Sequence, residues 1–153
     1  MQLIPVCQSP RTSPSARADE RAVEAMAGVI GCVGSQTFAN EALEQINRWL
    51  PVSWWSVFCF AEGAPPRMPA SGSYRMPDGT AESWKVYCAS LYREDQTFLA
   101  AREKVVESNK LLVHWHAREI PLPHREQIYT RHGLRERLSI VSRDQVGGLM
   151  AIN

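Results

Sequence analysis

The sequence predicts an α+β protein: an α-β-α sandwich whose central, mainly antiparallel sheet has about five strands and is covered by helices on both faces. Three observations predict this fold. Helical and strand patterns are interspersed along the chain, the segment 53–61 is apolar on both faces, and the chain ends in a hairpin pattern. A strand that is apolar on both faces lies inside a sheet that is covered on both sides.

Four segments have apolar residues at helical spacing, and a fifth is indicated by Pro123 at its start and Gly133 after its end. The clearest stripe is formed by Val23, Met26, Ile30 and Val33. Ser, Thr or Asp residues that favour helix starts precede several of these segments, and Gly or Pro residues follow them. The expected helices cover residues 19–33, 35–50, 80–91, 95–109 and 123–132.

Strands are expected over residues 53–61 and 111–117, and in a terminal hairpin where Leu138, Ile140, Val146, Met150 and Ile152 alternate around a turn near 142–145. Gly147 and Gly148 in this hairpin indicate a bulge or a close approach of two backbones. The segment 62–80 is rich in Pro and Gly, which predicts a loop with at most a short edge strand near 70–74.

Length and composition fit one soluble globular domain. The chain has 153 residues, of which we expect 1–17 to form a flexible lead-in and 18–153 to form the domain. Its 17 basic and 16 acidic side chains give a net charge of +1, which excludes a strongly basic nucleic-acid binder. Apolar runs are too short to cross a membrane. The four cysteines form no close-spaced motif, so we expect free thiols and a cytoplasmic protein.

The sequence does not predict an enzyme, because it contains none of the common catalytic or nucleotide-binding motifs. Cys59 could meet His114 or His116 as a catalytic pair, but a packed core thiol explains Cys59 more simply. His114 and His116 share a strand face and could hold a metal, with a third ligand from His124, His132 or a carboxylate. No spacing requires this, and we expect no metal and no cofactor.

A local excess of arginine lies between residues 118 and 143, with six arginines against three glutamates. The excess could mark a nucleic-acid surface, but no aromatic residues or recognition helix accompany it. We therefore expect Arg125 and Arg131 on an exposed helix face. Arg135 and Arg137, which flank Glu136, are expected to form ion pairs within the chain or at a subunit interface.

Aromatic residues are the strongest sign of a binding site. Those of interest are Trp54, Trp55, Trp84, Tyr87, Tyr92 and Trp115. Each combines a large apolar body with one hydrogen-bond donor, so the set could either fill the core or line a pocket for a small amphipathic ligand. Asp95 has the same ambiguity, since it could cap a helix or accept a proton from a ligand amide or amine.

Three stretches resemble the N-terminal sensory domain of LuxR-type transcriptional regulators, a GAF/PAS-type domain. These stretches are WKVYCASLYREDQTF (84–98), VHWHAREIP (113–121) and YTRHGLRERLSIVSRDQVGGLMAIN (129–153). In members that bind acyl-homoserine lactones, a Trp, a Tyr and an Asp hold the lactone ring and the amide. The resemblance implies that Trp84, Tyr87 and Asp95 take these roles, with Trp115 as a later pocket residue. The spacings between them are shorter than is usual, and Gln96 stands where Pro commonly follows the Asp, which implies a differently tuned sensor.

Trp55 and Ser139 complete the expected ligand-binding set. The resemblance implies a homodimeric small-molecule sensor that reaches DNA only through a C-terminal helix-turn-helix module, which this chain lacks. Two alternatives remain open. One is a ligand-free dimerisation or interaction module whose first two helices pair between copies. The other is an enzyme of GAF-like fold that uses Cys59 or Cys88.

Overall fold

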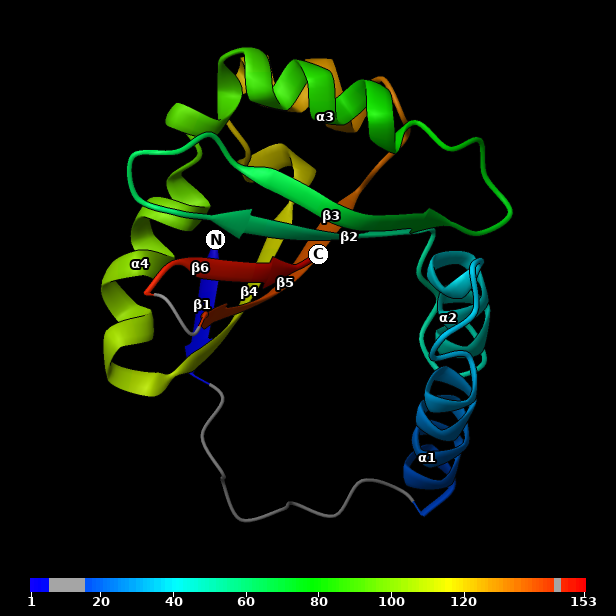
Figure 1. Cartoon of the computed structure of the whole chain (residues 1–153). Helices are drawn as coiled ribbons and strands as arrows, with labels where there is room; N and C mark the ends of the chain where they lie inside the picture. The colour runs from blue at the N-terminus through cyan, green and yellow to red at the C-terminus, as the bar shows by residue number, and fades with distance from the viewer. Residues whose placement is uncertain (6–15, 145–146) are drawn as a thin grey trace. The chain divides into compact units, whose positions relative to one another are not determined.

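The computed structural model describes residues 1–5, 16–144 and 147–153. In chain order (Figure 1) the elements are β1 (Gln2–Pro5), α1 (Ala16–Gly31), α2 (Phe38–Ile46), β2 (Trp54–Phe60), β3 (Arg67–Ser73), α3 (Thr80–Ala89), the 3-10 turn η1 (Leu91–Arg93), α4 (Gln96–Ser108), β4 (Lys110–His116), the 3-10 turn η2 (Ala117–Glu119), α5 (Leu122–His124), the π-helical η3 (Arg125–Thr130), β5 (Glu136–Arg143) and β6 (Leu149–Ile152). The α+β class predicted from the sequence is confirmed.

Within the described residues, six strands form one sheet in the order β1-β4-β5-β6-β2-β3. The pairs β1–β4, β4–β5, β5–β6 and β2–β6 are antiparallel, as predicted. The sheet exceeds the predicted five strands because Gln2–Pro5, expected in the flexible lead-in, pairs with β4. Pro5 is tolerated there because an edge strand has one side that needs no ladder N–H. The rest of that lead-in, residues 6–15, lies outside the described residues, and the domain boundary at residue 18 stays a prediction.

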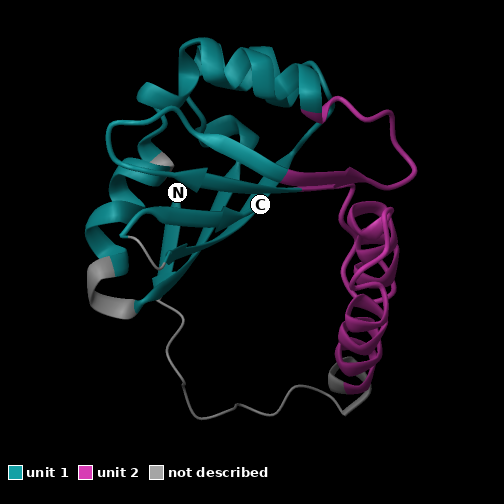
Figure 2. Cartoon of the chain, in the orientation of Figure 1, with its two compact units in different colours: residues 1–7, 56–69, 81–153 teal, residues 8–55, 70–80 magenta. Residues whose placement is uncertain are grey.

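The chain divides into two compact units (Figure 2). The larger holds β1 and residues 56–69 and 81–153, and the smaller holds α1, α2, the start of β2 and residues 70–80. In the smaller unit α1 packs against α2, and Ala25, Ala42 and Leu43 are buried. The predicted α1 stripe is exposed: its members Val23, Met26, Ile30 and Val33 are 57–70% accessible.

The core of the larger unit lies between one face of the sheet and α3, α4 and η3. The strand residues in it include Phe58, Phe60, Val113, Trp115, Val141 and Ala151, and the helical ones include Tyr87, Phe98, Ala101, Val105, Ile128 and Tyr129. These helices all pack on that one face. The prediction that helices also cover the opposite face stays a prediction.

Strand β5 shows the predicted alternation, but two of its three branched aliphatic side chains, Leu138 and Ile140, point outward. Leu138 and Ile140 are 44% and 46% exposed, whereas Ser139 and Val141 are fully buried. Because successive side chains of a strand point to opposite faces, Arg137 shares the inner face with Ser139 and Val141. A polar residue therefore enters the core at two positions of this strand.

The terminal hairpin contains the close backbone approach that its glycines predict. A Cβ at Gly148 would lie 2.6 Å from the carbonyl oxygen of Phe60. The Gly148 N–H donates to Asp144 Oδ1 at 2.6 Å, and the Asp144 N–H donates to the Gly148 carbonyl oxygen at 3.0 Å. Val146 lies outside the described residues.

The fifth expected helix is only partly α-helical. A three-residue α-helix, α5, continues as the π-helical segment η3, and Gly133 follows with φ of 67°. A left-handed glycine after the last turn is the helix end that the sequence predicts. None of the helices in the described part of the chain is long and apolar enough to cross a lipid bilayer.

Candidate functional site

Asp95 stands at the start of α4 with its carboxylate buried in the larger unit. Its backbone carbonyl accepts the first helical hydrogen bonds, from the N–H groups of Phe98 and Leu99. Its carboxylate accepts a hydrogen bond from the Tyr87 hydroxyl at 3.2 Å and lies 3.6 Å from Nη1 of Arg137. Asp95 thus occupies the position that precedes a helix and is also the acidic centre of a buried polar cluster.

Arg137 provides the positive charge of this cluster. The sequence predicted that Arg137 pairs with Glu136, within the chain or at a subunit interface, and that prediction is wrong. Strand alternation sends Glu136 to one face of the sheet and Arg137 to the other, where it pairs with Asp95 and lies 5.6 Å from the centre of the Phe98 ring. Replacing one partner of such a buried ion pair strongly destabilises the protein, because the remaining charge is left uncompensated.

Burial fixes the protonation of two further members. It lowers the pKa of His124 to about 4, against the attraction of Asp95, so the imidazole is neutral at pH 7. Burial also raises the pKa of Tyr87, as does the nearby Asp95 charge, so its hydroxyl keeps the proton that it donates to Asp95. The cluster therefore holds one anion, one cation and two neutral aromatic groups.

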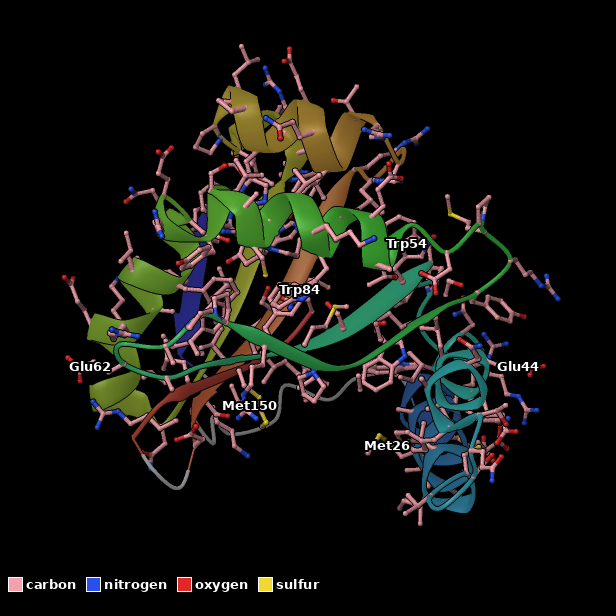
Figure 3. The ribbon with its side chains drawn as sticks, turned by 45° about the horizontal axis from the view of Figure 1, so that its top comes forward. Met26, Glu44, Trp54, Glu62, Trp84 and Met150 are labelled. Atoms are coloured by element: carbon pink, nitrogen blue, oxygen red, sulfur yellow. The ribbon has the colours of Figure 1, made fainter. Side chains whose placement is uncertain are left out.

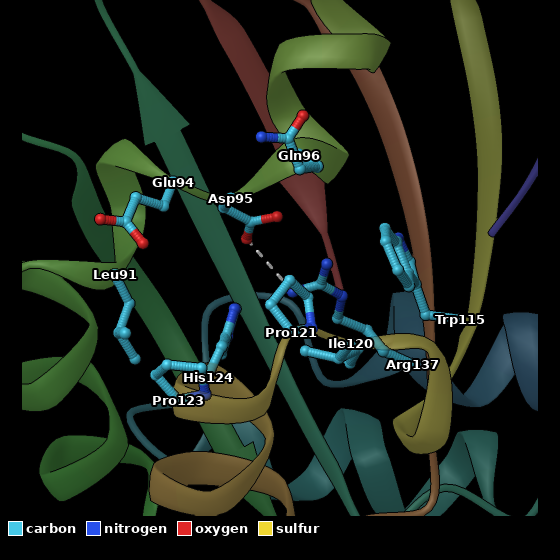
Figure 4. Close-up of a pocket in the computed structure, with 10 residues that line it drawn as sticks. All are labelled: Leu91, Glu94, Asp95, Gln96, Trp115, Ile120, Pro121, Pro123, His124 and Arg137. Atoms are coloured by element: carbon cyan, nitrogen blue, oxygen red, sulfur yellow. Dashed lines mark ion pairs between the residues drawn. The ribbon is translucent and has the colours of Figure 1, made fainter.

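A small cavity opens beside this cluster (Figure 4). Its lining consists of Leu91, Glu94, Asp95, Gln96, Trp115, Ile120, Pro121, Pro123, His124 and Arg137. The cavity volume of about 20 Å³ is room for a single water molecule. A larger ligand must displace part of the lining. Most of the lining comes from residues 91–96, which contain η1 and the start of α4, and from residues 120–124, which follow η2 and contain α5.

Trp115 brings an unused donor to the cavity. Its side chain is 93% buried, and no acceptor among the described residues lies within hydrogen-bond distance of Nε1. It stands directly opposite Arg137 in the β4–β5 register. A buried donor without a partner costs about 1–3 kcal/mol, which a ligand with a suitable acceptor can recover.

The expected ligand-binding residues do not all meet at the cavity. Asp95 and Trp115 line it, and Tyr87 supports it through Asp95. Trp84 points from α3 toward the sheet (Figure 3) and lies outside the lining. It stacks on Tyr87 with ring centres 5.7 Å apart, and the tilted ring of Phe58 is 4.8 Å away.

Trp55 and Ser139 also lie outside the lining. Trp55 belongs to the smaller unit, where its Nε1 donates to the Ala39 carbonyl at 2.7 Å. Ser139 is buried on β5 and donates to Asn153 Oδ1 at 2.7 Å. Both side chains are explained by these structural hydrogen bonds, so the structure gives them no part in the cavity wall.

The sequence interpretation missed Arg137 and His124. Arg137 could have been found from its parity with Ser139 and Val141 on β5, had that face been identified as the inner one. His124 had no comparable signal, because its burial depends on how the connection after β4 folds back over the cavity.

The catalytic pair considered for Cys59 does not form. Cys59 lies on β2, and the sheet order places β5 and β6 between β2 and β4, which carries His114 and His116. Three strand spacings of about 4.8 Å put the strands about 14 Å apart, too far for proton transfer. Cys59 has no partner there for nucleophilic catalysis.

No protein-family model and no curated protein matches the sequence, but solved structures match the fold. The ligand-binding domain of VqsR from Pseudomonas aeruginosa aligns with a TM-score of 0.59 and 12% identity, over 86% of this chain and 77% of that one. The N-acylhomoserine lactone dependent LuxR-family transcription factor CepR2 from Burkholderia cenocepacia aligns with a TM-score of 0.55 and 13% identity, over 90% and 77%. The chain has the fold of a LuxR-family ligand-binding domain. A phycoerythrobilin-bound GAF domain from a cyanobacterial phytochrome aligns at a TM-score of 0.43.

Proposed function

We propose that this chain is the sensory domain of a LuxR-type transcriptional regulator and binds a small molecule beside Trp115 and Asp95. The observation that carries the proposal is Trp115, which lines the cavity and whose buried indole N–H has no hydrogen-bond partner among the described residues, in a fold shared with ligand-binding domains. The regulatory neighbours also favour a sensor over an enzyme. In this proposal the protein is a cytoplasmic homodimer, and DNA binding belongs to a separate module.

The cavity wall indicates the chemistry of the ligand. Trp115 needs a hydrogen-bond acceptor such as a carbonyl oxygen, and the Asp95 carboxylate suits an amide, amine or hydroxyl donor. Ile120 and Leu91 add apolar surface beside these polar groups. A ligand that carries both an acceptor and a donor on a short apolar frame contacts all four side chains. Its binding shifts the protein's conformational equilibrium toward a form in which 91–96 and 120–124 have opened.

Isothermal titration with a panel of small amides and lactones, N-acyl-homoserine lactones among them, tests the proposal. Trp115→Phe keeps the aromatic bulk and removes only the donor. We expect this variant to bind at least about tenfold more weakly than the wild type, since one hydrogen bond is worth about 1.4 kcal/mol. Trp49→Phe is the matched control, because Trp49 is half-exposed and belongs to the smaller unit. Equal affinities of the wild type and Trp115→Phe would contradict the assignment.

A ligand-free dimerisation module is the second candidate. It is favoured by the small volume of the cavity and by the exposed stripe of Val23, Met26, Ile30 and Val33. Sedimentation analysis of Ile30→Glu tests it. A dimerisation module requires that the wild type is a dimer and that Ile30→Glu is a monomer. It also requires that no compound of the panel binds to the wild type.

A further inference from the structure

Three side chains with metal-binding groups meet on the sheet face opposite the cavity. His114 and His116 are two residues apart on β4, so their rings point to the same face. The β4–β5 register pairs His116 directly with Glu136, which brings a carboxylate onto that face. The two histidines could be predicted from the sequence, but Glu136 could not, because only the strand pairing shows which carboxylate lies across from them.

The three groups converge closely. His114 Nε2 lies 3.0 Å from Glu136 Oε2, and His116 Nδ1 lies 3.3 Å from Glu136 Oε1. The two imidazole rings have centres 4.8 Å apart, and one ligand atom from each of the three residues lies within 4.8 Å of the others. Each carboxylate oxygen therefore faces a different ring nitrogen.

We propose that His114, His116 and Glu136 form a binding site for a divalent transition-metal ion of the Zn²⁺ class. Two imidazoles and a carboxylate are ligands that Zn²⁺ accepts, and the set leaves a coordination position for water. Zn–N and Zn–O bonds of about 2.1 Å in a tetrahedral site place the ligand atoms about 3.4 Å from one another. The two nitrogen-to-oxygen separations of 3.0 and 3.3 Å are close to this spacing, with a different carboxylate oxygen in each. Small rotations of the side chains from their present positions, in which the three ligand atoms lie within 4.8 Å of one another, bring them around one ion.

The surroundings leave the site accessible and fix its backbone. The side chains of His116 and Glu136 are 40% and 54% exposed, so a hydrated ion can reach them. Glu119 is next to the site but already bound, since its Oε2 accepts the His116 N–H at 3.0 Å and its Oε1 pairs with the Met1 ammonium at 2.9 Å. Glu119 thus anchors the backbone at His116 and leaves the three named side chains as the ligand set.

Metal titration of the full chain, tag-free and first treated with a chelator, tests the proposal. We expect one Zn²⁺ per chain by isothermal titration. Co²⁺ should give the strong visible absorption of a four- or five-coordinate site. His116→Ala and Glu136→Gln should each weaken Zn²⁺ binding by at least about tenfold. Glu126→Gln, which alters an exposed carboxylate of η3, is the matched control and should bind as the wild type does.

Three results would overturn the site. Absence of Zn²⁺ binding by folded wild-type protein would show that the cluster is an ion pair only. Unchanged affinity in Glu136→Gln, or thiolate-to-cobalt charge-transfer absorption with Co²⁺, would place the ion on other ligands such as the cysteines. Circular dichroism of each variant shows whether it is folded, and Glu136→Gln keeps the shape of the side chain if His116→Ala does not fold.

Discussion

Replacing His124 by glutamine removes an imidazole whose pKa burial lowers from 6.5 to about 4. Between these values the unfolded chain binds the proton more readily than the folded one, so stability falls as the pH falls. The contribution of His124 is complete above about pH 6.5 and is lost progressively as the pH approaches 4. For a single group with these two pKa values, the loss between pH 7 and pH 5 is about 2 kcal/mol.

Urea denaturation followed by tryptophan fluorescence at pH 7 and pH 5 measures this loss. The carboxylates titrate in the wild type and in His124→Gln alike, so the difference between the two pH dependences isolates the imidazole. We expect the free energy of unfolding of His124→Gln to fall by about 2 kcal/mol less than that of the wild type. His132→Gln is the control: it removes a different histidine, which follows η3, by the same substitution. Equal pH dependences of the wild type and His124→Gln would refute the assignment of His124 as a buried, neutral group.

Three further predictions use the same denaturation assay. Asp95→Asn leaves the Arg137 charge buried without its partner and should cost about 3 kcal/mol, part of which the double variant Asp95→Asn/Arg137→Met should recover; no recovery would mean that the two charges do not interact. Gly148→Ala places a methyl group against the backbone of a neighbouring strand and should cost about 2 kcal/mol, whereas wild-type stability would argue against that close approach. Val141→Ala should cost about 2 kcal/mol and Ile140→Ala clearly less, and the reverse order would show that β5 presents its other face to the core.

The order of helices and strands could be predicted because each segment has local signals. Hydrophobic spacing, Pro51 after the second helix and Gly133 after the fifth all act within one or two turns of the chain. The strand Gln2–Pro5 could not be predicted in this way, because its stability comes from pairing with β4, more than a hundred residues later. Which face of β5 packs against the core could not be predicted either, because the strand has aliphatic side chains on both faces.

In the candidate site, too, some residues could be predicted from the sequence and others depend on the fold. Asp95, Tyr87 and Trp115 could be proposed from residue type and from the resemblance, and the structure brings them to one region. Arg137 could not be assigned, because its partner Asp95 is distant in sequence and only the fold brings the two charges together. Trp84, Trp55 and Ser139 carry groups suited to ligand binding. In the structure Trp84 stacks on Tyr87, Trp55 donates to a backbone carbonyl, and Ser139 donates to the Asn153 side chain.

The continuous pairing of β4 with β5 has a consequence for how quickly different parts of the larger unit exchange with solvent. Every residue of β4 has a partner on β5, and this ladder includes the pair Trp115 and Arg137. Amide protons in such a ladder exchange only in rare, extensive openings, whereas single helical turns and the loops beside them open far more often. Deuterium should therefore enter the backbone amides of 91–96 and 120–124 well before those of 111–116. This order is the one that the proposed entry of a ligand through the segments 91–96 and 120–124 requires.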